Sequence, residues 1–204
     1  MKELPILFSG PMVKAILDGR KTMTRRVIKG APGIMLYPQV QDCGVPIPEL
    51  IEAYKNAWLT TCPYGQPGDR LWVREAWAIR DCKPLFAAIF RADCVEDDSS
   101  ERDGWWIDKD RKGEEEFIPG KVEWKPSIFM PRWASRITLE ITAVRVERVQ
   151  DIGDEDAEAE GLSWCNAASP RDKFQCLWNS LNAKRGYGWE ANPWVWVIAF
   201  KRVK

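Results

Sequence analysis

Residues whose types could do chemistry gather first near the N-terminus, in residues 16–26, which read Ile-Leu-Asp-Gly-Arg-Lys-Thr-Met-Thr-Arg-Arg. This basic stretch holds one lysine, two threonines and three arginines. Arginine and lysine offer fixed positive charge and donors that suit phosphate or carboxylate, and a threonine hydroxyl can accept, donate or, once activated, attack. The stretch therefore fits either a site for an anionic ligand or a solvated basic strand on the surface.

A segment of opposite charge lies far along the chain. Residues 151–160 carry six acids and no base, in a short predicted helix that Gly161 ends. The sequence has no histidine, so the commonest general base is missing. A lysine beside a carboxylate and a hydroxyl is a minimal set for acyl-transfer hydrolysis under that constraint, because a lysine of lowered pKa can take a proton that the carboxylate then shuttles. The same charges, once together, could equally form a purely structural ion pair.

Composition narrows the class of protein. The length of 204 residues suits a single domain with a real core, and equal counts of basic and acidic residues, 30 each, exclude a bulk polycation. The six cysteines form no C-x-x-C pair, so we expect no metal site and no cofactor. No segment is apolar enough to span a membrane or act as a signal peptide, so we expect a cytoplasmic protein without a membrane partner.

The elements that must position these residues follow from periodicity and turn signals. Strands are expected at 4–8, 21–28, 71–79, 86–92, 137–149 and 194–203, and helices at 11–18, 49–58, 151–160 and 170–181. A phase slip within 137–149 is what a β-bulge at a barrel bend would produce. We therefore expect an α+β fold, a small closed or nearly closed β-barrel with flanking helices.

The whole chain, residues 1–204, is expected to form one domain with an elaborating insertion at about 30–124, interrupted by the core strand at 71–79. Within that insertion, residues 93–120 are expected to be a charged loop that contains Trp105 and Trp106.

An extended chain at 21–28 sets a geometric condition on the site. Side chains alternate along a strand, so Lys21 and Thr24 would face opposite sides of it. For both to serve one site, the backbone must still be turning at Arg20 and Lys21.

Five runs carry a family resemblance when taken together. They are Ile16–Arg25, Gly68–Trp77 (Gly-Asp-Arg-Leu-Trp-Val-Arg-Glu-Ala-Trp), Met130–Ile137 (Met-Pro-Arg-Trp-Ala-Ser-Arg-Ile), Asp156–Gly161 and Asn192–Val197. The set resembles the ASCH domain, a PUA-like β-barrel, and especially its longer phage-type and prophage-type members.

The resemblance implies an RNA-binding or RNA-associated module. Compact bacterial members similar to its core are amidohydrolases that remove the acetyl group of N4-acetylcytidine with a Lys, Thr and Glu catalytic set. Position within the matching motifs places that set on Lys21, Thr24 and Glu160. This chain is about twice as long as those enzymes, which leaves its substrate open.

The resulting hypothesis is a protein that binds RNA or a modified nucleoside in a barrel-mouth pocket and hydrolyses an exocyclic amide. Its alternatives are a non-catalytic RNA-binding module and a metal-independent ribonuclease. Expected contacts to nucleic acid or substrate are Arg20, Arg25, Arg26, Arg74, Glu75, Trp133, Ser135 and Arg136. Among them Arg25, Arg26 and Arg136 would hold phosphate, and Trp133 would either stack on a base or lie in the core.

Overall fold

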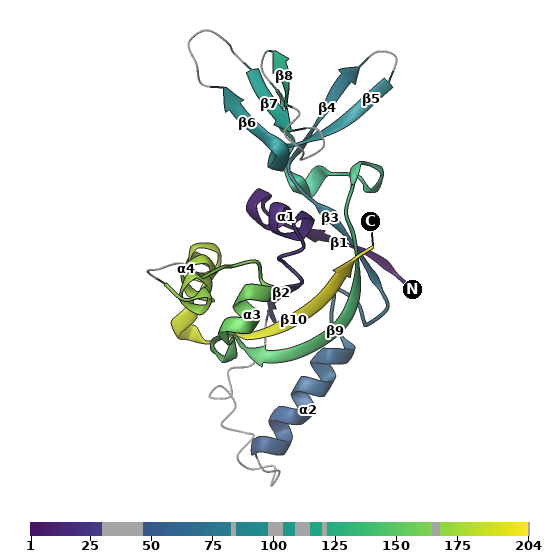
Figure 1. Cartoon of the computed structure of the whole chain (residues 1–204). Helices are drawn as coiled ribbons and strands as arrows, with labels where there is room; N and C mark the ends of the chain where they lie inside the picture. Colours follow the sequence, from purple (N-terminus) through teal and green to yellow (C-terminus); the bar gives the residue numbers. More distant parts are fainter. Residues whose placement is uncertain are drawn as a thin grey trace.

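A five-stranded mixed sheet organises the described part of the chain (Figure 1). The computed structural model describes residues 1–29, 47–82, 85–97, 104–108, 115–119, 122–164 and 168–203. The strands, in spatial order, are β1 (Glu3–Leu7), β3 (Arg70–Arg74), β9 (Thr138–Arg148), β10 (Trp194–Arg202) and β2 (Met23–Val27). The pair β1–β3 is parallel, and the other neighbours are antiparallel.

Strand β10 lies inside the sheet, between β9 and β2. Its run of β-branched and aromatic residues is buried from Trp194 to Ile198, as expected for a strand covered on both faces. The register between β10 and β9 slips between Ala199 and Phe200, which pair with Ala143 and Ile141. The β-bulge expected from the phase slip is therefore present.

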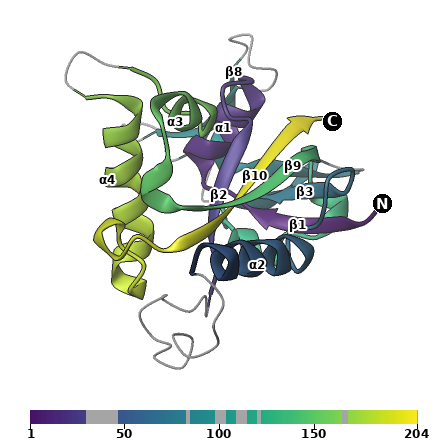
Figure 2. The same ribbon diagram turned by 90° about the horizontal axis from the view of Figure 1, so that it is seen from below.

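Within the described ranges, four α-helices flank the sheet. They are α1 (Gly10–Leu17), α2 (Ile47–Thr60), α3 (Asp154–Ala159) and α4 (Pro170–Asn182). Helices α3 and α4 pack together beside β2, whereas α2 lies under β9 on the side away from them (Figure 2). Short 3-10 helices occur at Arg91–Asp93, Ser127–Phe129, Arg132–Ala134, Val149–Asp151, Ala183–Arg185 and Trp189–Ala191. None of the described helices combines the length and apolarity that crossing a membrane would need.

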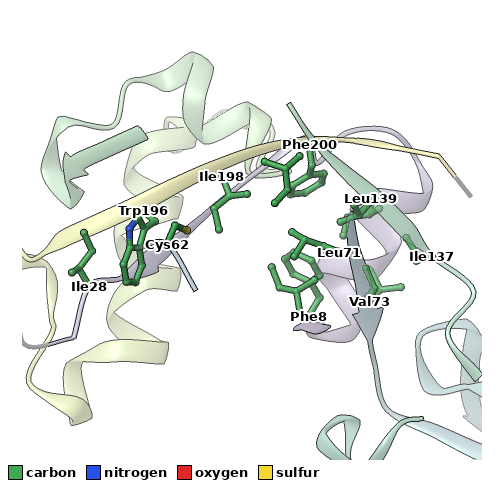
Figure 3. Close-up of a cluster of buried hydrophobic side chains, with 14 of the residues drawn as sticks. Phe8, Ile28, Cys62, Leu71, Val73, Ile137, Leu139, Trp196, Ile198 and Phe200 are labelled. Atoms are coloured by element: carbon green, nitrogen blue, oxygen red, sulfur yellow. The ribbon is translucent and has the colours of Figure 1, made fainter. Parts of the chain in front are cut away.

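Two apolar clusters hold these layers together. On one side of β10, Trp196, Ile198 and Phe200 pack with the side chains of β3, β9 and α1 (Figure 3). On the other side, Val195 and Val197 pack against α3 and α4. Pro170, Phe174 and Trp178 are the buried residues of α4, whereas Leu181 is 49% exposed.

Two small sheets project together from one end of the molecule (Figure 1). The first pairs β4 (Trp77–Cys82) with β5 (Leu85–Phe90), and the second contains β6 (Cys94–Asp97), β7 (Gly104–Asp108) and β8 (Glu115–Pro119). An isolated bridge joins Trp77 to Lys125, so the two ends of this projecting segment lie side by side. The side chains of Trp105 and Trp106 lie outside the described part of the structure.

Two sequence expectations are wrong in this region. The continuous strand 71–79 is divided at Glu75 and Ala76, because the chain leaves the main sheet there and enters a separate hairpin. The stretch 93–120, expected as a charged loop, contains three strands. Its aromatic and β-branched residues Trp105, Ile107, Phe117 and Ile118 favour strands despite the surrounding charge.

The α+β class is confirmed, but the main sheet is not closed into a barrel. Strands β1 and β2 form its two edges. Arg26 of β2 reaches across this opening and donates from Nη2 to the carbonyl of Leu7 at the end of β1, at 2.6 Å. A side chain therefore bridges the edges where a closed barrel would have a backbone ladder.

Candidate functional site

Lys21 and Glu160, the two charged members of the expected catalytic set, are in direct contact. Lys21 Nζ donates to Glu160 Oε2 at 2.5 Å and to the carbonyl of Glu160 at 3.0 Å. The side chain of Lys21 is fully buried, and that of Glu160 is 5% exposed. Residues 139 positions apart thus form an ion pair inside the protein.

The backbone is turning at Arg20 and Lys21, as the sequence required. The amides of both residues donate to the carbonyl of Ala15, at 2.9 and 3.0 Å, which wraps the chain around the end of α1. Lys21 then forms an isolated bridge with Glu160, and β2 begins only at Met23. Lys21 therefore precedes the strand whose alternation would have turned it away.

Close packing of Gly161 makes this approach feasible. Gly161 has φ +94°, and a Cβ there would lie 2.9 Å from Ala15 Cβ and 3.2 Å from Lys21 Cβ. Since a larger residue would push the end of α3 away from α1, a glycine is needed directly after Glu160.

Thr24 lies on the same strand but is not bonded to this pair. It is buried, three residues after Lys21, and pairs with Ile198 in the ladder between β2 and β10. Among the described residues, no hydrogen bond joins its hydroxyl to Lys21 or Glu160. The structure thus brings two of the three expected catalytic residues together, and leaves the third nearby along β2.

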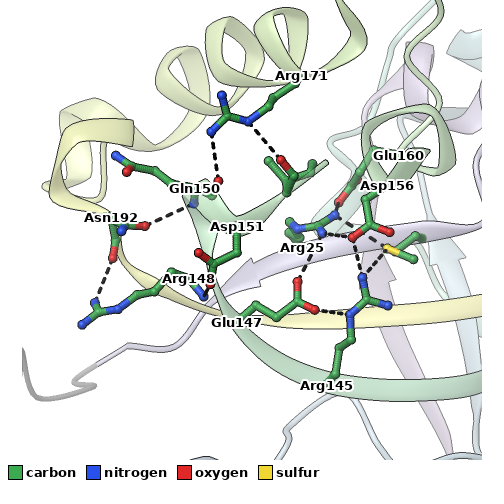
Figure 4. Close-up of polar contacts among 12 residues, drawn as sticks. Arg25, Arg145, Glu147, Arg148, Gln150, Asp151, Asp156, Glu160, Arg171 and Asn192 are labelled. Carbon is green, nitrogen blue, oxygen red and sulfur yellow. Dashed lines mark hydrogen bonds and ion pairs between the residues drawn. The ribbon is translucent and has the colours of Figure 1, made fainter. Parts of the chain in front are cut away.

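Arg25, expected at a phosphate, lies inside the protein. Its side chain has no exposed surface, and its Nη2 donates to Asp156 Oδ2 at 2.5 Å. Its Nη1 lies 3.6 Å from Glu160 Oε1. The ion pairs continue outward through Arg145 and Glu147 (Figure 4). The guanidinium of Arg25 is therefore occupied by carboxylates in this arrangement, which differs from the phosphate contact expected from sequence.

The pKa values of Lys21 and Asp156 are both lowered, but for different reasons. Burial lowers the pKa of Lys21, and this effect outweighs the opposing charge and hydrogen bond of Glu160. Partial burial would raise the pKa of Asp156, but hydrogen bonds and charge from Arg25 and Arg145 outweigh it and lower the pKa overall. A lysine that loses its proton more readily than usual is what a general base requires.

Arg20 and Arg26, the other expected cations of the basic stretch, bond to backbone carbonyls. The exposed side chain of Arg20 donates to the carbonyl of Gly161 at 3.0 Å and to Asp18 at 2.9 Å. Arg26 bridges to Leu7, and its guanidinium lies over the ring of Phe8, 5.2 Å from the centroid. Lys21 Nζ is 5.7 Å from the same centroid, so Phe8 contacts both cations.

A second ionic cluster forms where β3 ends. Arg136 donates two hydrogen bonds to Glu75, from Nε to Oε1 at 2.9 Å and from Nη2 to Oε2 at 3.0 Å. It also donates a hydrogen bond to Asp93. Burial would lower the pKa of Arg136, but the hydrogen bonds and charges of Glu75 and Asp93 outweigh it and raise that pKa. Glu75 is 1% exposed, so the guanidinium of Arg136 balances the charge of a buried carboxylate.

The remaining expected contacts are divided between interior and surface. Ser135 is buried and donates to the carbonyls of Val73 and Ile137, at 2.8 and 3.2 Å. Arg74 lies over the ring of Trp72, 4.5 Å from its centroid. Trp133 is 66% exposed and meets Trp77 edge-on at 5.8 Å, so the alternative that placed Trp133 in the core is wrong.

Sequence reasoning missed several partners of these residues. Asp156, Glu147 and Arg145 surround Arg25, and Asp93 completes the cluster at Arg136. The alternation of charges along 145–148 was a usable signal for Arg145 and Glu147, whereas nothing in the sequence tied Asp156 to Arg25 or Asp93 to Arg136.

Neither protein-family models nor curated protein sequences match the chain. Among solved structures, it is similar to the ASCH domain from Lactobacillus crispatus JV V101, with 11% identity and a TM-score of 0.43, covering 99% of this chain and 80% of that one.

A second solved structure is similar over the same extent. This is a protein of the DUF984 family from Enterococcus faecalis V583, with 10% identity and a TM-score of 0.40, covering 100% of this chain and 80% of that one. At such identities and scores, the likeness says nothing about substrate or about the roles of individual residues.

Proposed function

We propose that this chain binds RNA or a modified nucleoside and hydrolyses an exocyclic amide of the N4-acetylcytidine type at the Lys21–Glu160 pair. The observation that carries the proposal is the buried contact of 2.5 Å between these two side chains, with the pKa of Lys21 lowered by burial. Neutral Lys21 would take a proton from Thr24 or from water, and Glu160 would hold the amine and pass the proton to the leaving nitrogen. Water adds to the acyl carbon, the C–N bond breaks, and a carboxylic acid and an amine are released.

The experiment is hydrolysis of N4-acetylcytidine, followed by chromatography of cytidine. Lys21→Met and Glu160→Gln should each lower turnover at least about a hundredfold, the scale of removing a positioned acid or base. Thr24→Val tests whether the hydroxyl of Thr24 takes part in the reaction, because its side chain forms no hydrogen bond with Lys21 or Glu160 in the described part of the chain. Lost turnover would support a role as nucleophile, and unchanged turnover would exclude it. Lys201→Met, which removes an exposed partner of Glu140, is the matched control and should keep wild-type turnover. Absence of turnover in the wild type, with RNA still bound, would reject the proposed hydrolytic activity.

A second candidate, a non-catalytic RNA-binding module, is favoured by two specific observations. The side chain of Lys21 has no exposed surface, and Trp133 presents an exposed indole held edge-on by Trp77. An exposed, fixed aromatic ring suits stacking on an unpaired base.

Replacing the exposed indole tests this binding role. Trp133→Ala should weaken binding of single-stranded RNA by about 1–3 kcal/mol, the value of one base stack. Trp164→Ala removes an indole of similar exposure, 61%, and is the matched control. Equal affinity of the Trp133 variant and the wild type would remove Trp133 from the interface.

A further inference from the structure

A buried arginine adjoins the Lys21–Glu160 pair on the side opposite the lysine. Arg25 has no exposed side-chain surface, and its Nη1 is 3.6 Å from Glu160 Oε1. Glu160 Oε2 is taken by Lys21, while Oε1 is buried without a hydrogen-bond partner of its own. The two oxygens of one carboxylate thus face two different cations, Lys21 and Arg25. Figure 4 shows Glu160 beside Arg25.

The position of Arg25 is fixed from behind. Asp156, on α3, holds its Nη2 at 2.5 Å, and Glu147, on β9, lies 3.4 Å from the same nitrogen. Asp156 also accepts from Arg145 Nη2 at 2.5 Å. The guanidinium lies over the ring of Phe174 of α4, 5.8 Å from the centroid. Contacts from three elements therefore restrain a side chain that otherwise has many rotamers.

The charges alternate from the pair to the surface. The order is Lys21, Glu160, Arg25, Asp156, Arg145 and Glu147, with each contact at or below 3.6 Å. Asp156 holds Arg25 back at 2.5 Å, so that the arginine approaches Glu160 without the short hydrogen bond that Lys21 makes. Without that restraint, Arg25 could compete with Lys21 for the carboxylate.

We propose that Arg25, held by Asp156, is a positioning residue that orients Glu160 so that Oε2 stays on Lys21 Nζ. This inference rests on the proposed function in taking Lys21 and Glu160 as the reacting pair. It assigns a role to a residue that contacts no substrate, and it adds Asp156 as the residue that sets the distance of Arg25.

Two variants with opposite expected effects on the pKa of Lys21 distinguish a positioning role of Arg25 from a role in packing alone. The groups facing Lys21 are Glu160 at the end of α3, Arg25 and Arg26 on β2, and the ring of Phe8. Since the charge of Arg25 lowers the pKa of Lys21, Arg25→Met should raise that pKa. Asp156→Asn removes the carboxylate that neutralises Arg25, and it should lower the pKa of Lys21. Mere loss of packing gives no reason for shifts of opposite sign.

The measurement is an NMR titration of lysine labelled with ¹³C at Cε, with Lys21→Met to assign the signal and Lys201→Met as control. Opposite shifts in the two variants support the proposal, and titration unchanged from wild type in both would overturn it. If Arg25→Met does not fold, Asp156→Asn and Arg25→Lys decide it alone: an unchanged midpoint in both overturns the proposal, and a downward shift in Asp156→Asn supports it.

Turnover gives a second, independent readout. In a protein that hydrolyses N4-acetylcytidine, the acidic limb of the pH profile should move with the titration midpoint, and Arg25→Met should lose about tenfold in rate at neutral pH. A wild type without turnover rejects the proposed function, while the titration still decides whether Arg25 positions the pair.

Discussion

Two Arg–Glu contacts in this protein share the same chemistry but differ in burial. Arg136 holds Glu75 at 2.9 and 3.0 Å, and Glu75 is 1% exposed. Arg132 Nε holds Glu3 at 3.0 Å, with both side chains about two-fifths exposed. Removing Arg136 takes a doubly hydrogen-bonded cation from a carboxylate that solvent hardly reaches, whereas water replaces the partner of the exposed one.

We therefore expect Arg136→Met to lower the free energy of unfolding by about 3–5 kcal/mol, the cost of breaking a buried pair. Arg132→Met, the matched control, should cost about 1 kcal/mol or less. Urea unfolding followed by circular dichroism measures both. Equal costs would show that water reaches Glu75 freely.

Asp156 contributes to the free energy of unfolding in a way that depends on pH. Its pKa in the folded protein lies below the ordinary value of 3.8, because the contacts with Arg25 and Arg145 outweigh burial. The unfolded chain therefore binds the proton first as the pH falls, so the stability from this carboxylate is complete above pH 3.8 and lost as the pH falls through the folded pKa.

The stability difference between wild type and Asp156→Asn should accordingly be constant from neutral pH to about pH 5, and should shrink below 3.8. Urea titrations at several pH values measure this difference. Glu140→Gln, on an exposed pair with Lys201, is the control for general acid effects. A difference that grows on acidification would reverse the sign and contradict the lowered pKa.

Sequence reasoning could identify which residues belong to the candidate site, but not which residues contact one another there. Charge complementarity and the missing histidine singled out the turn at Lys21 and the acidic segment before Gly161, and these do meet. Arg25 could not be placed, because alternation told only that it faces away from Thr24 and not that α3 would cover that face with Asp156. Likewise, a conspicuous cation such as Arg136 gives no sign in sequence of a carboxylate 61 residues away.

At the scale of elements, the junction between α1 and α3 depends on one glycine. Gly161 adopts φ +94°, and an added Cβ would come within 2.9 Å of Ala15 Cβ. Gly186 also has a positive φ, +81°, but a Cβ there would meet nothing within 4 Å. The two positions thus share backbone strain and differ only in packing.

Gly186→Ala should cost about 1 kcal/mol, the penalty for a left-handed residue with a side chain. Gly161→Ala should cost clearly more, by about a further 1–3 kcal/mol for the overpacked contact. Thermal unfolding compares the two variants. Similar costs would show that α3 and α1 can separate, and hence that Lys21 and Glu160 are not held by this junction.

Helices and strands with a clear hydrophobic pattern could be predicted from sequence. Boundaries where a strand changes its pairing partner could not. Helix α4 with its capping box and strand β10 with its apolar run follow from local residues. The break at Glu75 and Ala76 does not, because the residues on both sides favour strand and only the pairing partner changes from β1 and β9 to β5. The open edge of the sheet has the same cause, since closure depends on which strands meet and not on what each strand contains.

At the scale of the whole molecule, the sheets should differ in local stability. Strand β10 is paired on both sides, with β9 and β2, and most of its residues are buried. Strands β4 and β5 form a separate two-stranded sheet, joined to the rest of the described chain by the bridge from Trp77 to Lys125 and by Trp77 packed on Met130 and Ala134. Isolated two-stranded hairpins are marginal in water, whereas a central strand opens only when its sheet unfolds.

Native-state hydrogen exchange should therefore give amides of β10 at least about tenfold more protection than those of β4 and β5. Amides of β9 serve as the internal reference, because they share the ladder with β10 and should exchange with it. Added denaturant should raise exchange in the hairpin first and in the main sheet last. Equal protection across β10 and β5 would mean that the projecting sheets and the five-stranded sheet unfold as one unit. In that case the contact of α1 with the segment Arg91–Asp93, which includes the buried Ala92, couples them more strongly than their hydrogen bonding indicates.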